Sequence, residues 1–308
     1  MILTVCPNPC IDYTIEVENI NVGRLNRIEN RIEHFAGKAC NTAIGVTRLG
    51  KAVTATGFLF DKGGKAFINY LEKENVNCNF VFNKGSLRVN FKIIDSKSML
   101  TELNDSGHEV TEQKQKELLT LVKELSSSAD VTVISGSLPK GVKAGYYYDL
   151  VKASNGKVIV DCETDKLKAA ISAGVYMVKP NLFELESFSN RQCKSYDDML
   201  SCCHSLIDAG VKKVLLSLGT RGAILTDGVT NLYCRSENVA VNSTVGAGDS
   251  MIAAASVCLQ EGFDDEELLR CAVAAGTASV TTPGTSLFKK EKYDEIYKKL
   301  KVSKIQKK

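Results

Sequence analysis

The residues of this sequence that could carry out chemistry lie at a turn of small side chains, where Gly246, Ala247 and Gly248 directly precede Asp249. The apolar run at residues 251–259 that follows is typical of a helix. Glycines leave room for backbone N–H groups to point at one spot, and the amino end of a helix adds partial positive charge there. The turn therefore predicts an anion hole, and phosphate is the anion that such a turn would hold.

Asp249 stands at the rim of this predicted anion hole. A carboxylate in that place can accept the proton of a hydroxyl group while the hydroxyl oxygen attacks phosphorus. The alternative is that Asp249 only caps the helix behind a glycine turn. Short glycine patterns do not decide between the two interpretations, so the rest of the chain must.

The composition restricts the class of protein. The chain has 308 residues, 44% of them hydrophobic, which is enough for one large α/β unit. A net charge of +3 is too small to indicate a nucleic-acid partner, and no apolar run approaches the roughly 18 residues of a membrane span. Residues 1–5 are typical of a first strand and not of a signal peptide. We therefore expect a cytoplasmic protein with no nucleic-acid or membrane partner.

The cysteines do not indicate a metal centre. There are eleven of them, at irregular spacings, and the pair Cys6 and Cys10 has no second pair at the spacing of a zinc site. In a reducing compartment such residues are small apolar side chains, and we expect them to be buried.

The elements that must position the turn follow a regular pattern after residue 110. Alternating helices and short apolar strands predict a doubly wound, mostly parallel sheet with helices on both faces. A strand at 237–241 is expected to lead into the turn, and the basic tail 301–308 is expected to be solvated. The predicted helices are 112–125, 144–153, 166–173, 196–209, 246–261, 264–280 and 289–300, and the predicted strands are 131–135, 158–161, 176–178 and 213–218, with a hairpin at 222–234.

The first hundred residues contain a second kind of strand. The segments 11–17, 28–35, 88–95 and 99–103 alternate apolar with charged or polar residues, which is typical of half-exposed strands. Such strands do not suit a buried parallel core, so they predict a small sheet that stands away from the main body.

Ligands of open parallel sheets bind at the carboxyl ends of the strands. This rule favours a functional role for Asp249, because many polar residues of the sequence follow predicted strands. They are Asp12, Ser135 to Ser137, Asp161, Lys179 to Asn181, Ser217 to Gly219 and the Gly246 turn. Asp161 is equally well explained as a turn residue, and we leave it outside the predicted site.

Taken together, these motifs resemble the ribokinase-like sugar kinases of the phosphofructokinase B type, and the resemblance covers the whole chain. Six motifs occur in the order of that family. They are Asn8-Pro9 with Asp12, Gly37-Lys38 with Asn41, Ser135 to Pro139, Lys179 to Asn181 with Glu184, Ser217 to Gly219, and Thr244 to Asp249. Within the family, the chain most resembles the branch of 1-phosphofructokinases and tagatose-6-phosphate kinases. The features that suggest this branch are the Ser-Gly-Ser-Leu-Pro run at 135–139, Arg88 and the compact length.

The resemblance implies a role for each motif. It implies that Asp249 is the general base and that the N–H groups of Ala247 to Asp249, behind Gly246, hold the transferred phosphoryl group. Asp12, Gly37, Lys38 and Asn41 would hold the sugar, and Arg24, Arg88 and Ser137 would reach its phosphate. Lys179, Asn181, Ser217, Gly219, Gly222 and Thr244 would border ATP, while Asn181 and Glu184 would act on Mg²⁺ indirectly, through phosphate.

Simpler interpretations stay open for several of these residues. Arg24, Arg88 and Lys38 could be solvated charges on the small sheet. Asn181 could cap a helix, and Glu184 could complete a capping box with it.

The resemblance also implies an architecture. It implies one kinase domain over residues 1–308, with lid strands inserted at about 11–35 and 87–104, and a homodimer that pairs through the lid. A lid that excludes water would prevent wasteful hydrolysis of ATP. The sequence departs from the family pattern at Ala36 and Ala39, where glycines are usual, and at 103–107 after the second pair of lid strands. These departures leave the identity of the sugar open.

Three functions fit these expectations. The first is an ATP-dependent kinase that converts fructose 1-phosphate into fructose 1,6-bisphosphate, and the second is a kinase of tagatose 6-phosphate or fructose 6-phosphate. The third is a sensor that binds a sugar phosphate without catalysis, although a sensor would not need Asp249. A kinase of nucleosides or neutral sugars is disfavoured, because three basic residues at lid positions suit a charged substrate.

Overall fold

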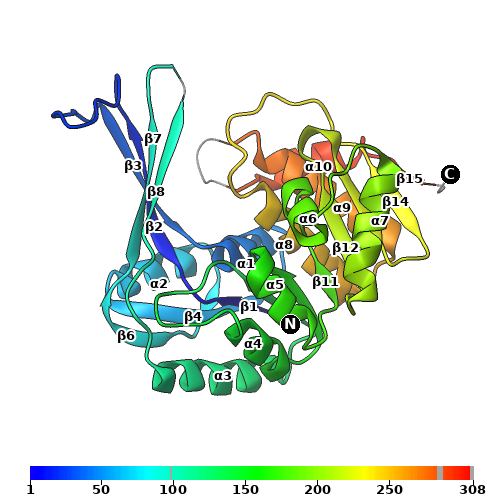
Figure 1. Ribbon diagram of the computed structural model, residues 1–308, viewed down its shortest axis with the longest axis horizontal. Coiled ribbons are helices and arrows are strands. Elements are labelled where there is room, and N and C mark those ends of the chain that lie inside the picture. Colours follow the sequence, from blue (N-terminus) through cyan, green and yellow to red (C-terminus); the bar gives the residue numbers. More distant parts are fainter. Residues whose placement is uncertain (98, 283–286, 306–308) are drawn as a thin grey trace.

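The centre of the protein is a sheet of eleven strands (Figure 1). The computed structural model describes residues 1–97, 99–282 and 287–305. The order of the strands is β5 (Asn77–Cys78) at one edge, then β4 (Val53–Lys62), β1 (Ile2–Cys6), β9 (Val131–Ser135), β10 (Lys157–Asp161), β11 (Met177–Val178), β12 (Lys213–Ser217), β13 (Ala223–Thr226), β14 (Asn231–Cys234) and β15 (Val302–Lys304), while β6 (Val81–Ser86) also pairs with β4.

The strands from β5 to β12 run parallel, and β13, β14 and β15 continue the sheet in antiparallel pairs. All residues of β1 and β9 are buried, as expected for apolar, partly β-branched strands that are covered on both faces. The doubly wound, mostly parallel sheet that the sequence predicts is therefore confirmed.

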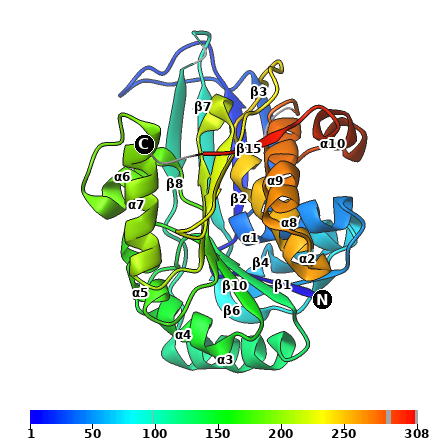
Figure 2. The same ribbon diagram turned by 90° about the vertical axis from the view of Figure 1, so that its right-hand side faces the viewer.

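Helices cover the sheet in two layers (Figure 2). Packing contacts link consecutive helices from α3 to α7 on one face, and they link α1, α8, α9 and α10 on the other. The bounds are α1 (Lys38–Arg48), α2 (Gly64–Lys73), α3 (Glu112–Ser126), α4 (Tyr146–Ala153), α5 (Thr164–Ile171), α6 (Leu182–Ser189), α7 (Tyr196–Asp208), α8 (Ala247–Glu261), α9 (Asp265–Ser279) and α10 (Lys290–Tyr297), with a short 3₁₀ turn, η1, at Gly219–Arg221.

The contact between α1 and α8 matters for the site, because these two helices carry Asn41 and Asp249. Both helices are rich in small residues, so their backbones lie close together. A methyl group added at Gly45 of α1 would lie 2.6 Å from the Cβ atom of Ala253 in α8. The small residues therefore bring the two helices close enough for side chains at their amino ends to meet.

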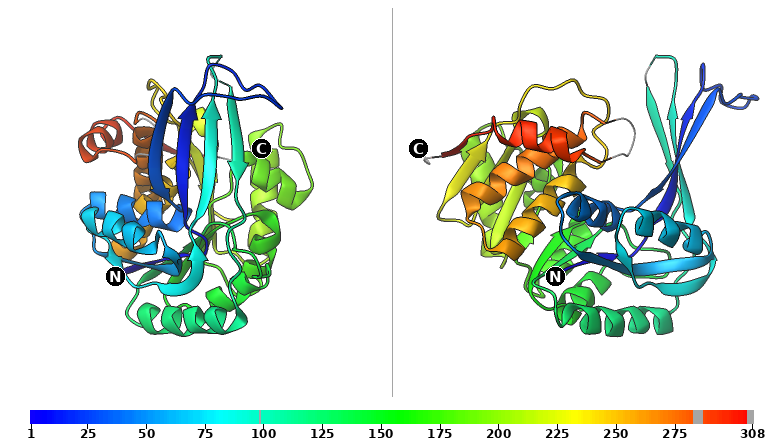
Figure 3. Two further views of the ribbon diagram at one scale, coloured as in Figure 1. Left: turned by 90° about the vertical axis from the view of Figure 1, so that its left-hand side faces the viewer. Right: turned by 180° about the vertical axis from the view of Figure 1, so that it is seen from behind.

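A second, separate sheet of four strands stands away from the main body (Figure 3). Its order is β3 (Asn30–Ala36), β2 (Cys10–Glu16), β7 (Arg88–Ile94) and β8 (Leu100–Asn104), with the central pair parallel and the outer pairs antiparallel. We call it the small sheet. The second sheet expected from the alternating charged segments is therefore confirmed.

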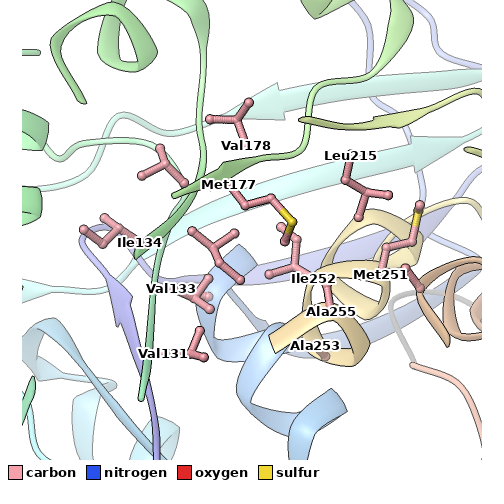
Figure 4. Packing of buried hydrophobic residues seen from close by; sticks show 14 of the residues in the cluster. Val131, Val133, Ile134, Met177, Val178, Leu215, Met251, Ile252, Ala253 and Ala255 are labelled. Carbon is pink, nitrogen blue, oxygen red and sulfur yellow. The ribbon is translucent and has the colours of Figure 1, made fainter. Parts of the chain in front are cut away.

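The hydrophobic core fills the space between the main sheet and its helices. Side chains of β9, β11 and β12 lie opposite Met251, Ile252, Ala253 and Ala255 of α8 (Figure 4). Most cysteines are buried, as predicted, and all eleven thiols are free. Among residues 1–97, 99–282 and 287–305, no helix is both long and apolar enough to span a bilayer.

Two expectations about local structure are wrong. Residues 237–241 form no strand, because they run along the wall of a cavity and pair with no neighbouring strand. The tail is not simply solvated, since Val302–Lys304 forms β15 on the open edge of β14. Lys307 and Lys308 of that tail lie outside the described residues.

Candidate active site

The turn before α8 has the geometry of an anion site. Gly246 lies in the left-handed region with a φ of 81° and precedes the first residue of α8. The first bond of the helical ladder runs from the Ser250 N–H group to the Gly246 carbonyl at 2.9 Å. The N–H groups of Gly248 and Asp249 therefore precede this ladder and point out of the amino end of the helix.

Asp249 is buried beside this amino end and is held from α1. The Asn41 side-chain amide donates to Asp249 Oδ2 at 2.8 Å, and Thr42 Oγ1 donates to the Asp249 carbonyl at 3.4 Å. Burial and the negative charge of Asp161 raise the pKa of Asp249 to about 6, against the opposing effects of Asn41 and two lysines. A carboxylate with this pKa is ionised at neutral pH and suited to accept a proton.

Asp161 joins two parts of the site. It ends β10, is 3% exposed, and faces Lys38 Nζ at 3.4 Å and Lys179 Nζ at 3.7 Å. Burial acts to raise the pKa of Asp161, but the two ammonium groups outweigh it and hold that pKa below its usual range. Asp161 was not predicted to belong to the site, although its place at the end of a predicted strand indicated this position.

Gly248 allows Lys179 to approach the turn. A Cβ atom at residue 248 would lie 2.9 Å from Lys179 Nζ, so any larger residue would displace the ammonium group. Two lysines and two carboxylates therefore converge where the predicted anion hole opens. Both lysines face Asp161, so their ammonium groups are held where they can also donate to a phosphate group while Asp249 stays available as a base.

Asp12 lies on the small sheet and is buried among donors. The carboxylate accepts hydrogen bonds from Asn90 Nδ2 at 2.9 Å and from Lys92 Nζ at 2.7 Å, and from the Cys10 thiol at 3.1 Å. Burial acts to raise the pKa of Asp12, but Lys92 and the hydrogen bonds hold it below its usual range. Asn90 and Lys92 were not predicted from the sequence, although they alternate with apolar residues on the same strand as Arg88.

Asn8 connects Arg88 and Ser137. Arg88 Nε donates to the Asn8 carbonyl at 3.1 Å, and the Asn8 side-chain amide donates to Ser137 Oγ at 3.2 Å. Arg88 Nη1 also donates to Asn90 Oδ1 and to the Asp105 carbonyl, both at 3.2 Å. Two of the three residues predicted to reach the sugar phosphate are thus held near each other and near Asp12.

Arg24, the third of these residues, lies elsewhere. It belongs to the exposed loop that joins β2 to β3, at the end of the small sheet far from α8 (Figure 1). The structure therefore does not bring Arg24 to Asp12 and Arg88. The loop is exposed along most of its length, and even its apolar side chains Val22 and Leu25 face the solvent.

A cavity of about 670 Å³ lies on the other side of the turn. Its inner end reaches Ala247 and Gly248, and its walls include η1 and residues of α9. The six residues expected to border ATP all line it: Lys179, Asn181, Ser217, Gly219, Gly222 and Thr244. The volume is in the usual range of a small-molecule pocket.

Asn181 and Glu184 form a capping box at the start of α6. Glu184 N–H donates to Asn181 Oδ1, and Asn181 N–H donates to Glu184 Oε2, both at 2.8 Å. The simpler interpretation of these two residues is thus observed. The second carboxylate oxygen of Glu184 takes no part in the capping box, and the Glu184 charge contributes to the raised pKa of Lys38. In the described part of the chain no cluster of three metal-ligating side chains occurs. These residues fit Mg²⁺ held mainly by phosphate and water, which is the usual coordination of that ion.

Known proteins resemble this chain in sequence and in fold. The model of the pfkB family of carbohydrate kinases matches residues 7–292. The 1-phosphofructokinase of Vibrio cholerae serotype O1 is 29% identical over 306 residues, covering 98% of this chain and 96% of the relative. The 1-phosphofructokinase of Escherichia coli K12 is 30% identical over 283 residues, covering 91% of each chain.

Solved structures agree with this relationship. The crystal structure of phosphofructokinase-2 from Escherichia coli in complex with substrates and products has a TM-score of 0.90 at 31% identity, covering 97% of this chain and 98% of that one. The sequence resemblance, the fold and the family match all agree. This chain belongs to the pfkB family of carbohydrate kinases and is a phosphotransferase with an alcohol group as acceptor.

Proposed function

We propose that this kinase transfers the terminal phosphoryl group of ATP to a ketohexose phosphate, and that its preferred reaction converts fructose 1-phosphate into fructose 1,6-bisphosphate. The observation that carries the proposal is the burial of Asp249 at the amino end of α8, where Gly248 lines the 670 Å³ cavity and Asn41 of α1 holds the carboxylate. The relatives named 1-phosphofructokinase support the choice of sugar.

Asp249 would act as the general base. The free 6-hydroxyl of fructose 1-phosphate gives its proton to the Asp249 carboxylate while its oxygen bonds to the γ-phosphorus, and the bond from that phosphorus to the bridging oxygen of ADP breaks. The N–H groups of Gly248 and Asp249, with Lys179 and Lys38 nearby, would stabilise the charge of the transferred group. Asn41 fixes the carboxylate through its bond to Oδ2.

The two ends of the sugar phosphate would be held differently. Asp12, Gly37, Lys38 and Asn41 would bind hydroxyl groups, while Arg88 and Ser137 would bind the existing phosphate. Arginine suits this role because its guanidinium group can donate two parallel hydrogen bonds to phosphate. Arg24 would have to arrive by movement of its exposed loop or from a second copy of the chain.

Carbohydrate kinases of this family use ATP, usually with Mg²⁺. We propose that ATP occupies the 670 Å³ cavity, with its phosphates toward Gly248 and Lys179. Mg²⁺ would neutralise charge on the β- and γ-phosphates, held through water by Glu184 and Asn181. The protein's own contribution is to orient the nucleotide along η1 and the turn at Thr244.

We also propose that residues 1–308 act as one kinase domain with the small sheet as its lid, and that two copies pair through their lids in the cytoplasm. Most of the exposed large apolar side chains of the described residues belong to the small sheet and its loops: Ile20, Val22, Leu25, Ile28, Ile32, Met99, Leu100 and Leu103. Apolar patches of this kind mark contact surfaces. The phosphofructokinase-2 of Escherichia coli has a tetrameric inhibited form, so association occurs among relatives.

A substrate panel tests the proposal. Purified protein with ATP and Mg²⁺ is offered fructose 1-phosphate, fructose 6-phosphate, tagatose 6-phosphate and the unphosphorylated ketohexoses, and ADP release and product mass are measured. Fructose 1-phosphate should give the highest kcat/KM. A higher kcat/KM for a 6-phosphate would change the proposed substrate but not the proposed type of reaction. Fructose 6-phosphate is the second candidate substrate, because a structural neighbour was solved in complex with it. Binding of a sugar phosphate without ADP release would favour the sensor instead.

A further inference from the structure

The face of the small sheet that carries Asp12 also carries a row of polar side chains. Asp12 of β2 pairs in register with His34 of β3 and with Asn90 of β7, and Asn90 pairs with Asn104 of β8. In-register neighbours point to the same face of a sheet, and so do residues two apart on one strand. Lys92, two residues after Asn90, therefore lies on this face beside Asp12.

The contacts of Asp12 leave little of its carboxylate free. Oδ1 accepts from Cys10 and Asn90, while Oδ2 accepts from Lys92 alone. An ionised carboxylate offers about four acceptor positions, so one position remains, and it is on the oxygen that Lys92 holds. The ion pair with Lys92 therefore fixes the direction in which Asp12 Oδ2 can accept one more hydrogen bond.

The ion pair is also largely shielded from water. The side chains of Lys92 and Asp12 are 12% and 7% exposed, and their charged atoms are 2.7 Å apart. Among the ion pairs of the described residues, most others lie in far more exposed positions. A charge that is buried and paired in this way keeps its partner in one orientation, because breaking the pair would leave a buried charge uncompensated.

We propose that Lys92 is a positioning residue for substrate, which fixes the Asp12 carboxylate so that its one free acceptor position takes a sugar hydroxyl. This inference rests on the proposed function. A hydroxyl group can donate to that position. A phosphate monoester is mostly a dianion at neutral pH, so its oxygens only accept hydrogen bonds and are repelled by the carboxylate. Cys10 pairs in register with Arg88, so the basic end of the same face lies next to Asp12. Lys92 thereby sets which end of the sugar phosphate faces Asp12 and which faces Arg88.

Binding and kinetics of Lys92→Met test this role. The variant should raise both the Kd and the KM for fructose 1-phosphate, or for the ketohexose phosphate that the panel selects, by about tenfold or more, as expected for a lost charge-assisted hydrogen bond. The kcat and the KM for ATP should stay near wild type, and Lys92→Arg should restore most of the affinity. Lys97→Met is the matched control, because it removes the same charge from the exposed turn of the same sheet, away from Asp12.

A double variant separates positioning from simple stabilisation. If Lys92 acts through Asp12, then Asp12→Asn with Lys92→Met should bind the sugar phosphate no more weakly than Asp12→Asn alone, and it should fold because no buried charge is left unpaired. Additive losses, or a lower melting temperature for Lys92→Met with unchanged sugar affinity, would overturn the inference. Titration calorimetry reads the Kd without turnover, so a sugar phosphate that binds but is not phosphorylated contradicts the proposed function alone. A wild-type protein that binds no ketohexose phosphate overturns both.

Discussion

At the scale of single residues, Asp249, the proposed base, keeps a raised pKa although two lysines lie near it. Asn41 and the two lysines favour the charged form of Asp249, while burial and Asp161 favour the protonated form, and the pKa settles near 6. A lower pKa would weaken the base, and a higher one would leave it protonated at neutral pH. Asp161 therefore acts on Asp249 through its charge, which is, after burial, the second cause that raises the pKa of Asp249.

The first prediction concerns Asp249→Asn. The new side chain has nearly the same size and can still accept the hydrogen bond from the Asn41 amide, but it cannot take up a proton. We expect kcat to fall by about 10² to 10⁴, with both KM values near wild type. The melting temperature at pH 7.5 should not fall, since a buried charge is removed. The alternative that Asp249 caps α8 is wrong, because Gly246 is the N-cap residue and no side chain bonds there. A folded variant with normal turnover would therefore contradict the proposed role of Asp249 as a base.

The second prediction concerns pH. A base must be unprotonated, so kcat/KM should rise with pH through an acid limb near the pKa of Asp249, about 6. Asp161→Asn removes a negative neighbour that raises this pKa, so its acid limb should lie at lower pH than that of the wild type. The pH profiles of kcat/KM measure both limbs. A limb that stays in place in Asp161→Asn would show that another group controls it.

At the scale of elements, the site depends on how closely α1 and α8 approach. Asn41 is in the first turn of α1 and Asp249 is in the first turn of α8, so their hydrogen bond requires that the helices meet near those ends. Gly45 and Ala253 make that approach possible one turn further along.

The third prediction is that Gly45→Ala damages stability and catalysis together. The new methyl group would lie 2.6 Å from Ala253 Cβ, and neither backbone can move without parting the helices. Overpacking of this kind costs roughly 1–3 kcal/mol, more than the gain in helix propensity of about 1 kcal/mol. A lower melting temperature with a lower kcat is the expected result. Gly145→Ala is the control, since a methyl group there has no neighbour within 4 Å, and equal behaviour of both variants would contradict the prediction.

The sequence predicted the elements of the main body well, because their apolar periodicity is local and regular. It could not place residues 237–241, whose valines suit a strand but line a cavity, since a strand needs a partner that composition does not reveal. It likewise missed β15, because the basic composition of the tail hides its pairing with the open edge of β14. Within the site, Lys92 was missed because its importance comes from a partner about eighty residues away in the chain.

At the scale of the whole molecule, the small sheet carries Asp12, Asn90 and Lys92 on one face and exposed apolar side chains at its free end and edge. The loop from β2 to β3 and the outer strand β8 hold Val22, Leu25 and Leu103, which are 93%, 78% and 56% exposed. A second copy of the chain would cover such residues.

The fourth prediction is that the small sheet mediates dimer formation. Wild-type protein at micromolar concentration should sediment as a dimer, and Leu103→Lys should sediment as a monomer, because a charge would be buried in the contact. Val229→Lys is the control, since Val229 is equally apolar and 90% exposed but lies in the turn between β13 and β14 of the main sheet. A dimer that persists in Leu103→Lys but dissociates in Val229→Lys would place the contact on the main body.

The small sheet is tied to the main body by four pieces of chain. Residues 7–9 lead from β1 to β2, Gly37 leads from β3 to α1, and Leu87 leads from β6 to β7, while residues 105–111 lead from β8 to α3. Three of these tethers have three residues or fewer, so they restrict sliding of the sheet and leave rotation about the tethers as its easiest movement. Arg88 is the first residue after the Leu87 tether, whereas Lys38 begins α1 of the main body. A rotation of the sheet would therefore move Arg88 relative to Lys38, but far less than it would move the free end of the sheet.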